Sequence, residues 1–353
     1  MSPTTLNLVE IDSLTATIII DNEIDVLSTT PSIVQNKGRQ ANIMASQPHI
    51  LMNRGEAKQE IPMEAICCGA HGLSVLVTVT KDGVSHSLLF DTGPEGEAWE
   101  RNATRLGLDI ALIEVIQLSH WHRDHSGGML RAISMITAAK SKSESNSSPV
   151  IIDLHPSRPT FRGFRFGVGE EERVVSMQAD PSFAEIENAG GVVRKEAGAH
   201  AILGGWFGVS GEIPRESGYE RGIRGGVRFD EGEKGEGKWV SDEEILDERF
   251  LMCNLKGKGI ILFTGCSHGG VVNASRHSVD LLDGKVPLYA VLGGYHLVGE
   301  QEAKIPNTVR DLKALEPRVL LPGHCSGWRA KVEIEREMPG VLVPCTVGSM
   351  FVF

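Results

Sequence analysis

The sequence lacks most of the features that mark membrane, secreted or nucleic-acid-binding proteins. Its 353 residues contain no run of about 18 or more apolar residues, so no membrane span is expected. The start, Met-Ser-Pro-Thr-Thr, has no basic region followed by an apolar stretch, so no secretory signal is visible. The six cysteines are sparse and follow no disulfide framework, which favours free thiols in a reducing cytosol. The formal net charge of −11 disfavours a nucleic-acid surface, because phosphate binding requires clustered lysine and arginine.

The length and the 41% hydrophobic content allow a large core, in one or two domains. Runs rich in β-branched residues alternate with segments of helical pattern, which is typical of an α/β architecture with its site at one edge. We expect strands at 14–24, 73–80, 86–90, 150–154, 259–263, 288–292 and 319–321, and helices at 97–106, 129–140, 271–282 and 303–315. The similar order of the two halves predicts one pseudo-duplicated sandwich and not two independent domains.

Three polar segments interrupt this pattern, and we predict them as surface insertions in a single domain spanning 1–353. They lie near 25–60, 138–149 and 216–249. The second contains a Ser-rich run, and the third is rich in glycine and charge. We interpret the third as a mobile loop over or beside the site, with a solvated loop of no particular role as an equal alternative.

The segment 118–128, Leu-Ser-His-Trp-His-Arg-Asp-His-Ser-Gly-Gly, contains four potential metal ligands directly after an apolar run. Residues i and i+2 of an extended segment point to the same side, so His120 and His122 can bind one cation together. Asp124 and His125 then turn away and can bind a second cation close by. Imidazole nitrogen with carboxylate oxygen suits zinc best, with iron or manganese as lesser options. The pattern predicts a centre that holds one or two ions.

More ligands are expected at later strand ends, because two ions need more donors than this segment supplies. His268, in Thr-Gly-Cys-Ser-His, and His324, in Leu-Leu-Pro-Gly-His, follow buried strands and are predicted as ligands. His296 is a third histidine after a strand, and three roles stay open for it. It could be a metal ligand, a hydrogen-bond donor to substrate, or a residue that supports the ligands without binding the metal. His200 lacks a strong strand-end context and is interpreted as a surface histidine.

Four other residues are predicted to support the ligands or to contact substrate, namely Asp91, Cys266, His71 and Tyr295. Asp91 follows a buried strand and is expected to accept the N–H of a ligand imidazole, which fixes the tautomer of the ring. Cys266 is interpreted as a packed thiol, with a thiolate ligand as the alternative. Tyr295 and His296 are candidate donors to an oxyanion or a leaving group.

The motif at 120–128 is the signature of the metallo-β-lactamase superfamily, and the sequence resembles that superfamily along most of its length. Within it, the sequence looks like the subgroup named 7,8-dihydropterin-6-methyl-4-(β-D-ribofuranosyl)aminobenzene-5'-phosphate synthase. The matching pieces are 21–22, 71–74, 90–93, 120–128, 155–156, 211–215, 264–268, 293–297 and 322–325. The resemblance implies an αββα sandwich with the metals at one edge of the two sheets. Many members carry a bridging aspartate in a Thr-Gly-Asp turn, where this sequence has Thr264-Gly265-Cys266.

The resemblance implies a metal-dependent hydrolase, with zinc as the expected cofactor. A metal-bound hydroxide would attack an amide or ester bond of a small molecule, with a lactam or lactone favoured, while Asp124 binds one ion and orients the nucleophile. Such an enzyme is expected to be cytoplasmic, with no membrane or nucleic-acid partner. A transferase of the synthase type is the alternative, with Arg215 and the Gly-rich loop as weak phosphate contacts. A phosphoester hydrolase and a non-catalytic metal-binding protein also stay open, as does the oligomeric state.

Overall fold

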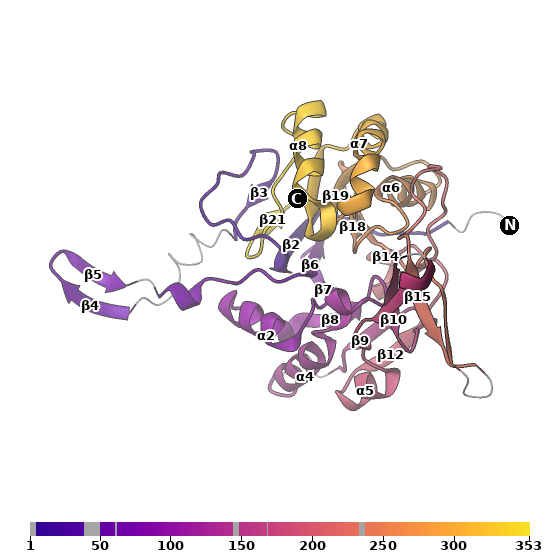
Figure 1. The fold of residues 1–353 in the computed structure, drawn as a ribbon. Helices are drawn as coiled ribbons and strands as arrows, with labels where there is room; N and C mark the ends of the chain where they lie inside the picture. Colours follow the sequence, from indigo (N-terminus) through magenta and orange to yellow (C-terminus); the bar gives the residue numbers. More distant parts are fainter. Residues whose placement is uncertain (1–4, 39–49, 61, 144–147, 168, 233–236) are drawn as a thin grey trace.

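Two β-sheets stack face to face at the centre of the molecule, and helices cover their outer sides (Figure 1). The structure is a computed structural model, and it describes the chain except for residues 1–4, 39–49, 61, 144–147, 168 and 233–236. The four layers are the αββα arrangement that the sequence predicts. Among the described residues, every helix is too short or too polar to cross a lipid bilayer.

The first sheet has eight strands in the order β12-β9-β8-β7-β6-β2-β21-β3. Strands β7, β8, β9 and β12 run parallel, and β2 and β6 pair antiparallel beside them. The bounds are β2 Ser13–Ile20, β3 Gln35–Asn36, β6 Ser74–Lys81, β7 Val84–Phe90, β8 Ile113–Gln117, β9 Ile151–Leu154, β12 Val192–Lys195 and β21 Met350–Val352. Helices α2 (Gly96–Arg105), α4 (Met129–Lys140) and α5 (Phe183–Asn188) cover its outer face.

The second sheet has seven strands, six in the order β13-β14-β17-β18-β19-β20 and β1 paired with β17. Strands β18, β19 and β20 are parallel, so the loops that follow them leave from the same edge. The bounds are β1 Glu10–Ile11, β13 His200–Ile202, β14 Phe207–Val209, β17 Leu251–Leu255, β18 Gly259–Thr264, β19 Leu288–Gly294 and β20 Val319–Gly323. Helices α6 (Val271–Asp280), α7 (Ile305–Ala314) and α8 (Trp328–Glu337) cover its outer face.

The alternation of side chains along each strand divides the core into three layers. In β2, Leu14, Ala16 and Ile18 belong to the cluster between the two sheets, whereas Ile19 belongs to the cluster beneath α2 and α4. Successive residues of a strand point to opposite faces, so a strand that is apolar on both faces joins two layers at once. This arrangement fixes the strand ends, and therefore the loops that carry the polar motifs.

Two insertions contain more regular structure than the sequence suggests. The prediction of a mobile loop over 216–249 was wrong for two segments, which form β15 (Gly226–Asp230) and β16 (Lys238–Ser241). These strands pair with β10 (Arg162–Phe166) and β11 (Arg173–Ser176) in a separate four-stranded sheet, which we call the inserted sheet. In the first insertion, β4 (Ile50–Arg54) and β5 (Ala57–Glu60) form a hairpin that projects from the body (Figure 1).

The remaining short helices lie in the connections. They are α3 Arg123–Ser126, η1 Met63–Ala65, η2 Ile110–Leu112, η3 Gly169–Glu171, η4 Leu203–Gly205, η5 Gly299–Lys304 and η6 His324–Ser326. Two of them, α3 and η6, begin directly at the polar motifs that follow β8 and β20.

Candidate metal centre

Potential metal ligands from three strand ends meet at one edge of the sandwich. The loop after β8 carries His120 and continues into α3, which carries His125. The turn after β18 carries Cys266 and His268, and the turn after β20 begins at His324. Since these positions lie far apart in the sequence, only the stacking of the two sheets brings them together.

Three histidines form the first set of donors, which we call the histidine group. His120 Nε2 lies 2.9 Å from His122 Nδ1, and His268 Nε2 lies 3.1 Å from the same atom. Each of the three side chains is almost fully buried. Three ring nitrogens that point at one another present lone pairs to one point in space, which is the arrangement a cation needs.

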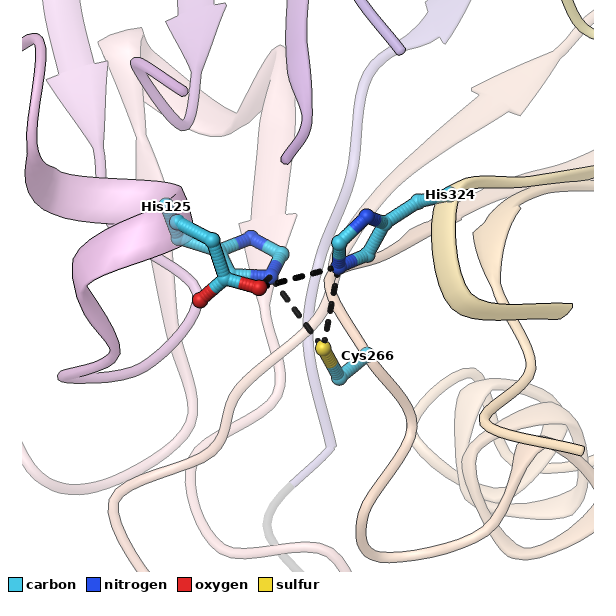
Figure 2. A group of neighbouring side chains, drawn as sticks. His125, Cys266 and His324 are labelled. Atoms are coloured by element: carbon cyan, nitrogen blue, oxygen red, sulfur yellow. Dashed lines mark hydrogen bonds and ion pairs between the residues drawn. The ribbon is translucent and has the colours of Figure 1, made fainter. Parts of the chain in front are cut away.

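Asp124, His125 and His324 form the second set, which we call the mixed group. Asp124 Oδ2 lies 3.3 Å from His324 Nε2 and 3.8 Å from His125 Nε2. The sulfur of Cys266 lies 3.2 Å from His125 Nε2 and 3.3 Å from His324 Nε2. Figure 2 shows the two imidazoles turned toward this sulfur from opposite sides. Cys266 is also within 4.8 Å of donor atoms of His120 and His268, so it lies between the two groups.

In His120, His125 and His324 the Nδ1 atom, which faces away from the centre, has a hydrogen-bond partner. His125 Nδ1 donates to Asp91 Oδ2 at 2.6 Å. The same carboxylate accepts from the hydroxyl of Ser119, whose oxygen in turn accepts from His120 Nδ1 at 2.9 Å. His324 Nδ1 donates to Asn22 Oδ1 at 3.0 Å. In these three rings the Nδ1 proton is held by its partner, so Nε2 is the atom that can bind a cation. Burial opposes the charge of His125 and His324, but the carboxylates of Asp91 and Asp124 raise the pKa of His125, and Cys325 and Asp124 raise that of His324. A cation would therefore have to displace a proton from Nε2 of these two rings.

Buried carboxylates hold the backbone of the ligand loops. Asp21 accepts from the backbone N–H of His324 at 2.9 Å, and Glu248 accepts from that of His268 at 2.9 Å. The backbone is left-handed at His324, with φ of 47°, which is uncommon for a residue other than glycine. Such a conformation persists only where the surroundings fix it, and it occurs most often at functional sites.

A solved structure shows the fold family. The chain and a metal-dependent hydrolase of the β-lactamase superfamily superpose with a TM-score of 0.61, at 20% identity, over 96% of this chain and 98% of the other. This chain has the metallo-β-lactamase fold. The fold implied by the motif at 120–128 is confirmed.

Two sequence relatives come from Methanocaldococcus jannaschii. One is named 7,8-dihydropterin-6-methyl-4-(beta-D-ribofuranosyl)-aminobenzene-5'-phosphate synthase; it is 28% identical over 263 residues, which cover 74% of this chain and 82% of the relative. The other is an uncharacterized protein, 27% identical over 266 residues, which cover 75% of this chain and 88% of the relative. No family model matches the sequence.

The donor chemistry of this metallo-β-lactamase fold fits a transition-metal cation. Burial lowers the pKa of His120 and His268 well below the ordinary value of 6.5, and it lowers that of His122 to about 3. The three rings are therefore neutral near pH 7, as ligand imidazoles must be. Imidazole, carboxylate and thiol donors within 4.8 Å of one another suit zinc, with iron as an alternative. The described residues thus form a possible metal-binding cluster.

The position of Cys266 favours the alternative that it is a ligand. The sequence context favours a packed thiol at this position, and the side chain is indeed buried. However, its sulfur faces ring nitrogens of both groups, at the place where many members of the superfamily have a bridging aspartate. Burial raises the pKa of the thiol, so it becomes a thiolate only when a cation displaces the proton.

The other predicted residues lie around the centre. His71 is 70% exposed, and its Nε2 lies 3.5 Å from Asp124 Oδ2 at the open side. His296 is not part of either donor group, but its ring lies 4.6 Å from the ring of His268. Tyr295 is not placed as a donor to substrate, because its buried hydroxyl donates to the carbonyl of Val291 within β19.

His200 is not the surface histidine that the sequence suggested. Its side chain is 20% exposed, and its Nε2 lies 2.8 Å from Asp153 Oδ2. Asp153 also pairs with the buried Arg249. Asp153 and Arg249 were not predicted as site residues, and neither were Asn22, Ser119 and Glu248. The acidic and basic run at 247–249 directly before the buried strand β17 was a signal that could have been used.

Proposed function

We propose that this chain is a metal-dependent hydrolase of a small molecule, with cations held by the histidine group and the mixed group. The observation that carries the proposal is the convergence of both groups on Cys266, with the sulfur 3.2 Å from His125 Nε2 and 3.3 Å from His324 Nε2. The related fold of a metal-dependent hydrolase supports the same class of chemistry. A zinc ion held by these residues would lower the pKa of a water from about 15.7 to about 7 and would polarise the bond under attack.

Two residues at the open side of the centre would position the substrate. The Asp124 side chain is 24% exposed, so one carboxylate oxygen can orient the attacking water while the other oxygen faces the cluster. His71 Nδ1 accepts from the amide of Asn22 at 3.1 Å, so the proton of this ring lies on Nε2, beside Asp124. That N–H can donate to a carbonyl, phosphoryl or leaving-group oxygen, whose charge rises during the reaction.

The test begins with the metal content of the purified full-length chain. We expect bound zinc, iron or manganese, loss of turnover after chelation, and recovery when the metal is returned. A panel of lactams, lactones, thioesters and phosphodiesters would identify the bond that is cleaved. His122→Ala should lower metal content and lower turnover by at least about a hundredfold.

His86→Gln is the matched control, because His86 pairs with Glu114 on the first sheet and belongs to neither donor group. It should leave both metal content and turnover unchanged. A chain that binds no transition metal, or that turns over equally well after chelation, would contradict the proposal.

A synthase reaction is the second candidate, favoured by the relative of that name at 28% identity over 74% of this chain. This reaction needs a residue that binds phosphate. Arg215, the residue expected for that role, already has other hydrogen-bond partners. The guanidinium of Arg215 donates to the carbonyls of Ile213 and Glu244. The amino end of α6, another position suited to phosphate, receives the carboxylate of Glu220. Assays that offer a phosphorylated ribose donor with an aromatic amine, beside the hydrolase panel, would separate the two candidates.

A further inference from the structure

We propose that a hollow between the inserted sheet and the loop after β19 binds a planar aromatic group of the substrate. This inference rests on the proposed function, because the hollow would serve the same metal centre. Its volume is about 640 Å³, and its walls include Phe164, Phe166, Arg224, His296 and Val298. A volume of this size accommodates the non-reacting part of a small substrate.

Two phenylalanines of the inserted sheet give the hollow its aromatic wall. Phe164 and Phe166 are two residues apart on β10, so both project from the same face of the strand. Their rings lie 6.2 Å apart at an angle of 46°, and Phe166 is 50% exposed. A neighbouring ring, Phe161, instead packs on Phe229 of the same sheet. A pair of tilted and accessible rings offers edges and faces to a further ring, which is the geometry that aromatic groups prefer.

Arg224 adds a planar cation on the side of the inserted sheet, because it directly precedes Gly225, whose carbonyl accepts from the backbone N–H of Arg165 in β10. Val298 adds an apolar contact from the loop after β19. Arg224 is 82% exposed, and its guanidinium lies 3.8 Å from the equally exposed carboxylate of Glu300. Such a surface pair is weak, so the guanidinium can stack on a ring that enters the hollow. Val298, 38% exposed, lies across from the phenylalanines. Phenyl and guanidinium planes together favour a flat π-system over a branched alkyl group.

His296 connects the hollow to the metal centre. It lines both the hollow and a narrow groove that continues to Ser267 and His268. Its ring lies 4.6 Å from that of His268, a member of the histidine group. A ring held between Phe166 and Val298 could therefore extend a reactive substituent along His296 toward the cations.

The test compares two ligands that share a carbon skeleton. Binding of 2-naphthoate, which is planar, and of decalin-2-carboxylate, which is saturated, is measured by calorimetry on the full-length chain. We expect wild type to prefer 2-naphthoate, and Phe164→Leu/Phe166→Leu to weaken its binding by about tenfold, because both ring contacts are lost. Leucine keeps the wall apolar, so the affinity for the saturated acid should not fall.

Phe161→Leu removes a ring of the same sheet outside the hollow and should leave both affinities unchanged. Val298→Trp fills the hollow from the other wall and should abolish preferential binding even if the double variant fails to fold. Equal binding of the two acids to wild type, or an unchanged affinity for 2-naphthoate in Val298→Trp, would overturn the inference. Titrations before and after chelation separate this inference from the proposed function. If 2-naphthoate binds to a chain that has no metal and no turnover, only the proposed function is contradicted. If the chain has metal-dependent turnover but does not bind 2-naphthoate preferentially, only the proposed role of the hollow is contradicted.

Discussion

Arg249 carries a buried charge that ties the two sheets together beneath the metal-binding loop. Its guanidinium donates to Asp153 Oδ1 at 2.8 Å, to the carbonyl of Glu196 at 3.1 Å and to the carbonyl of Leu118 at 3.0 Å. The side chain has no exposed surface. The change we consider is Arg249→Met, which keeps an unbranched side chain of similar length and removes the charge and all of these donors.

The expected loss of stability follows from what the substitution leaves behind. The Asp153 carboxylate, 5% exposed, would keep only His200 as a charged partner. The carbonyls of Glu196, Leu118 and Asp153 would each lose a donor. Removing one partner of a buried ion pair costs about 3–5 kcal/mol, because the other charge stays buried. Since the imidazole of His200 can neutralise part of that charge, we expect a loss of about 3 kcal/mol. This is a large fraction of the stability of a typical domain, about 5–15 kcal/mol.

Urea unfolding near pH 6, followed by tryptophan fluorescence, would measure this difference. Arg329→Met is the matched control, because Arg329 pairs with Glu302 at the surface, with 54% of its side chain exposed, and should change the free energy of unfolding by less than about 1 kcal/mol. The double variant Arg249→Met/Asp153→Asn should recover part of the loss, since no buried charge then stays unpaired. If Arg249→Met unfolds within about 1 kcal/mol of wild type, the reasoning is refuted.

Three further predictions concern charge and ligation. Burial opposes the charge of His200, but the carboxylate of Asp153 outweighs burial and raises the pKa of the imidazole. The stability that this ion pair contributes is therefore fully present below the ordinary pKa of about 6.5. It is lost as the pH rises through the raised pKa. Unfolding measured from about pH 6 to about pH 9 should show this loss in wild type and not in His200→Asn. Cys266→Ser should weaken zinc binding by at least about tenfold, while Cys68→Ser, which changes an exposed thiol, should not; equal zinc affinities would exclude the sulfur as a ligand. Asp91→Asn should weaken metal binding by about 10–100-fold through the tautomer of His125, and a metal titration that matches wild type would remove Asp91 from that role.

The part of the site that was predictable from the sequence is the part governed by local spacing and strand order. His120 and His122 are two residues apart, so extended backbone alone turns both toward one point. His268 and His324 follow buried apolar runs, and parallel strands deliver such positions to one edge. The same reasoning located most central strands and helices to within a few residues, including a helix at Met129–Lys140.

The parts that the sequence did not reveal depend on contacts between distant residues of common types. Nothing near Glu220 indicates that its carboxylate receives the backbone N–H groups of Val272 and Asn273 at the start of α6. The inserted sheet was missed because β10 and β15 pair across about sixty residues of chain, and glycine and charge dominate the second of these segments. The hydroxyl of Tyr295 was misjudged because a strand-end tyrosine can turn either toward the site or back along its own strand.

Buried carboxylates connect the sheets of this molecule to the loops that carry its potential metal ligands. Each ligand-bearing loop has at least one: Asp21 at His324, Glu248 at His268, and both Asp91 and Asp247 at the loop after β8, where they bind His125 and Trp121. Each accepts N–H groups of its loop, which offsets part of the cost of burying the charge and holds the loop in one conformation. Protein contacts therefore preorganise the donor atoms, which strengthens binding because little ordering is left to occur on association. The inserted sheet joins this framework, because Arg162 of β10 donates to the carbonyl of Trp121 at 2.9 Å and to the carboxylate of Asp247 at 3.2 Å. A substitution at Arg162 would therefore disturb the loop that carries His120 and His122, whereas Phe164 and Phe166, on the same strand, line the proposed hollow.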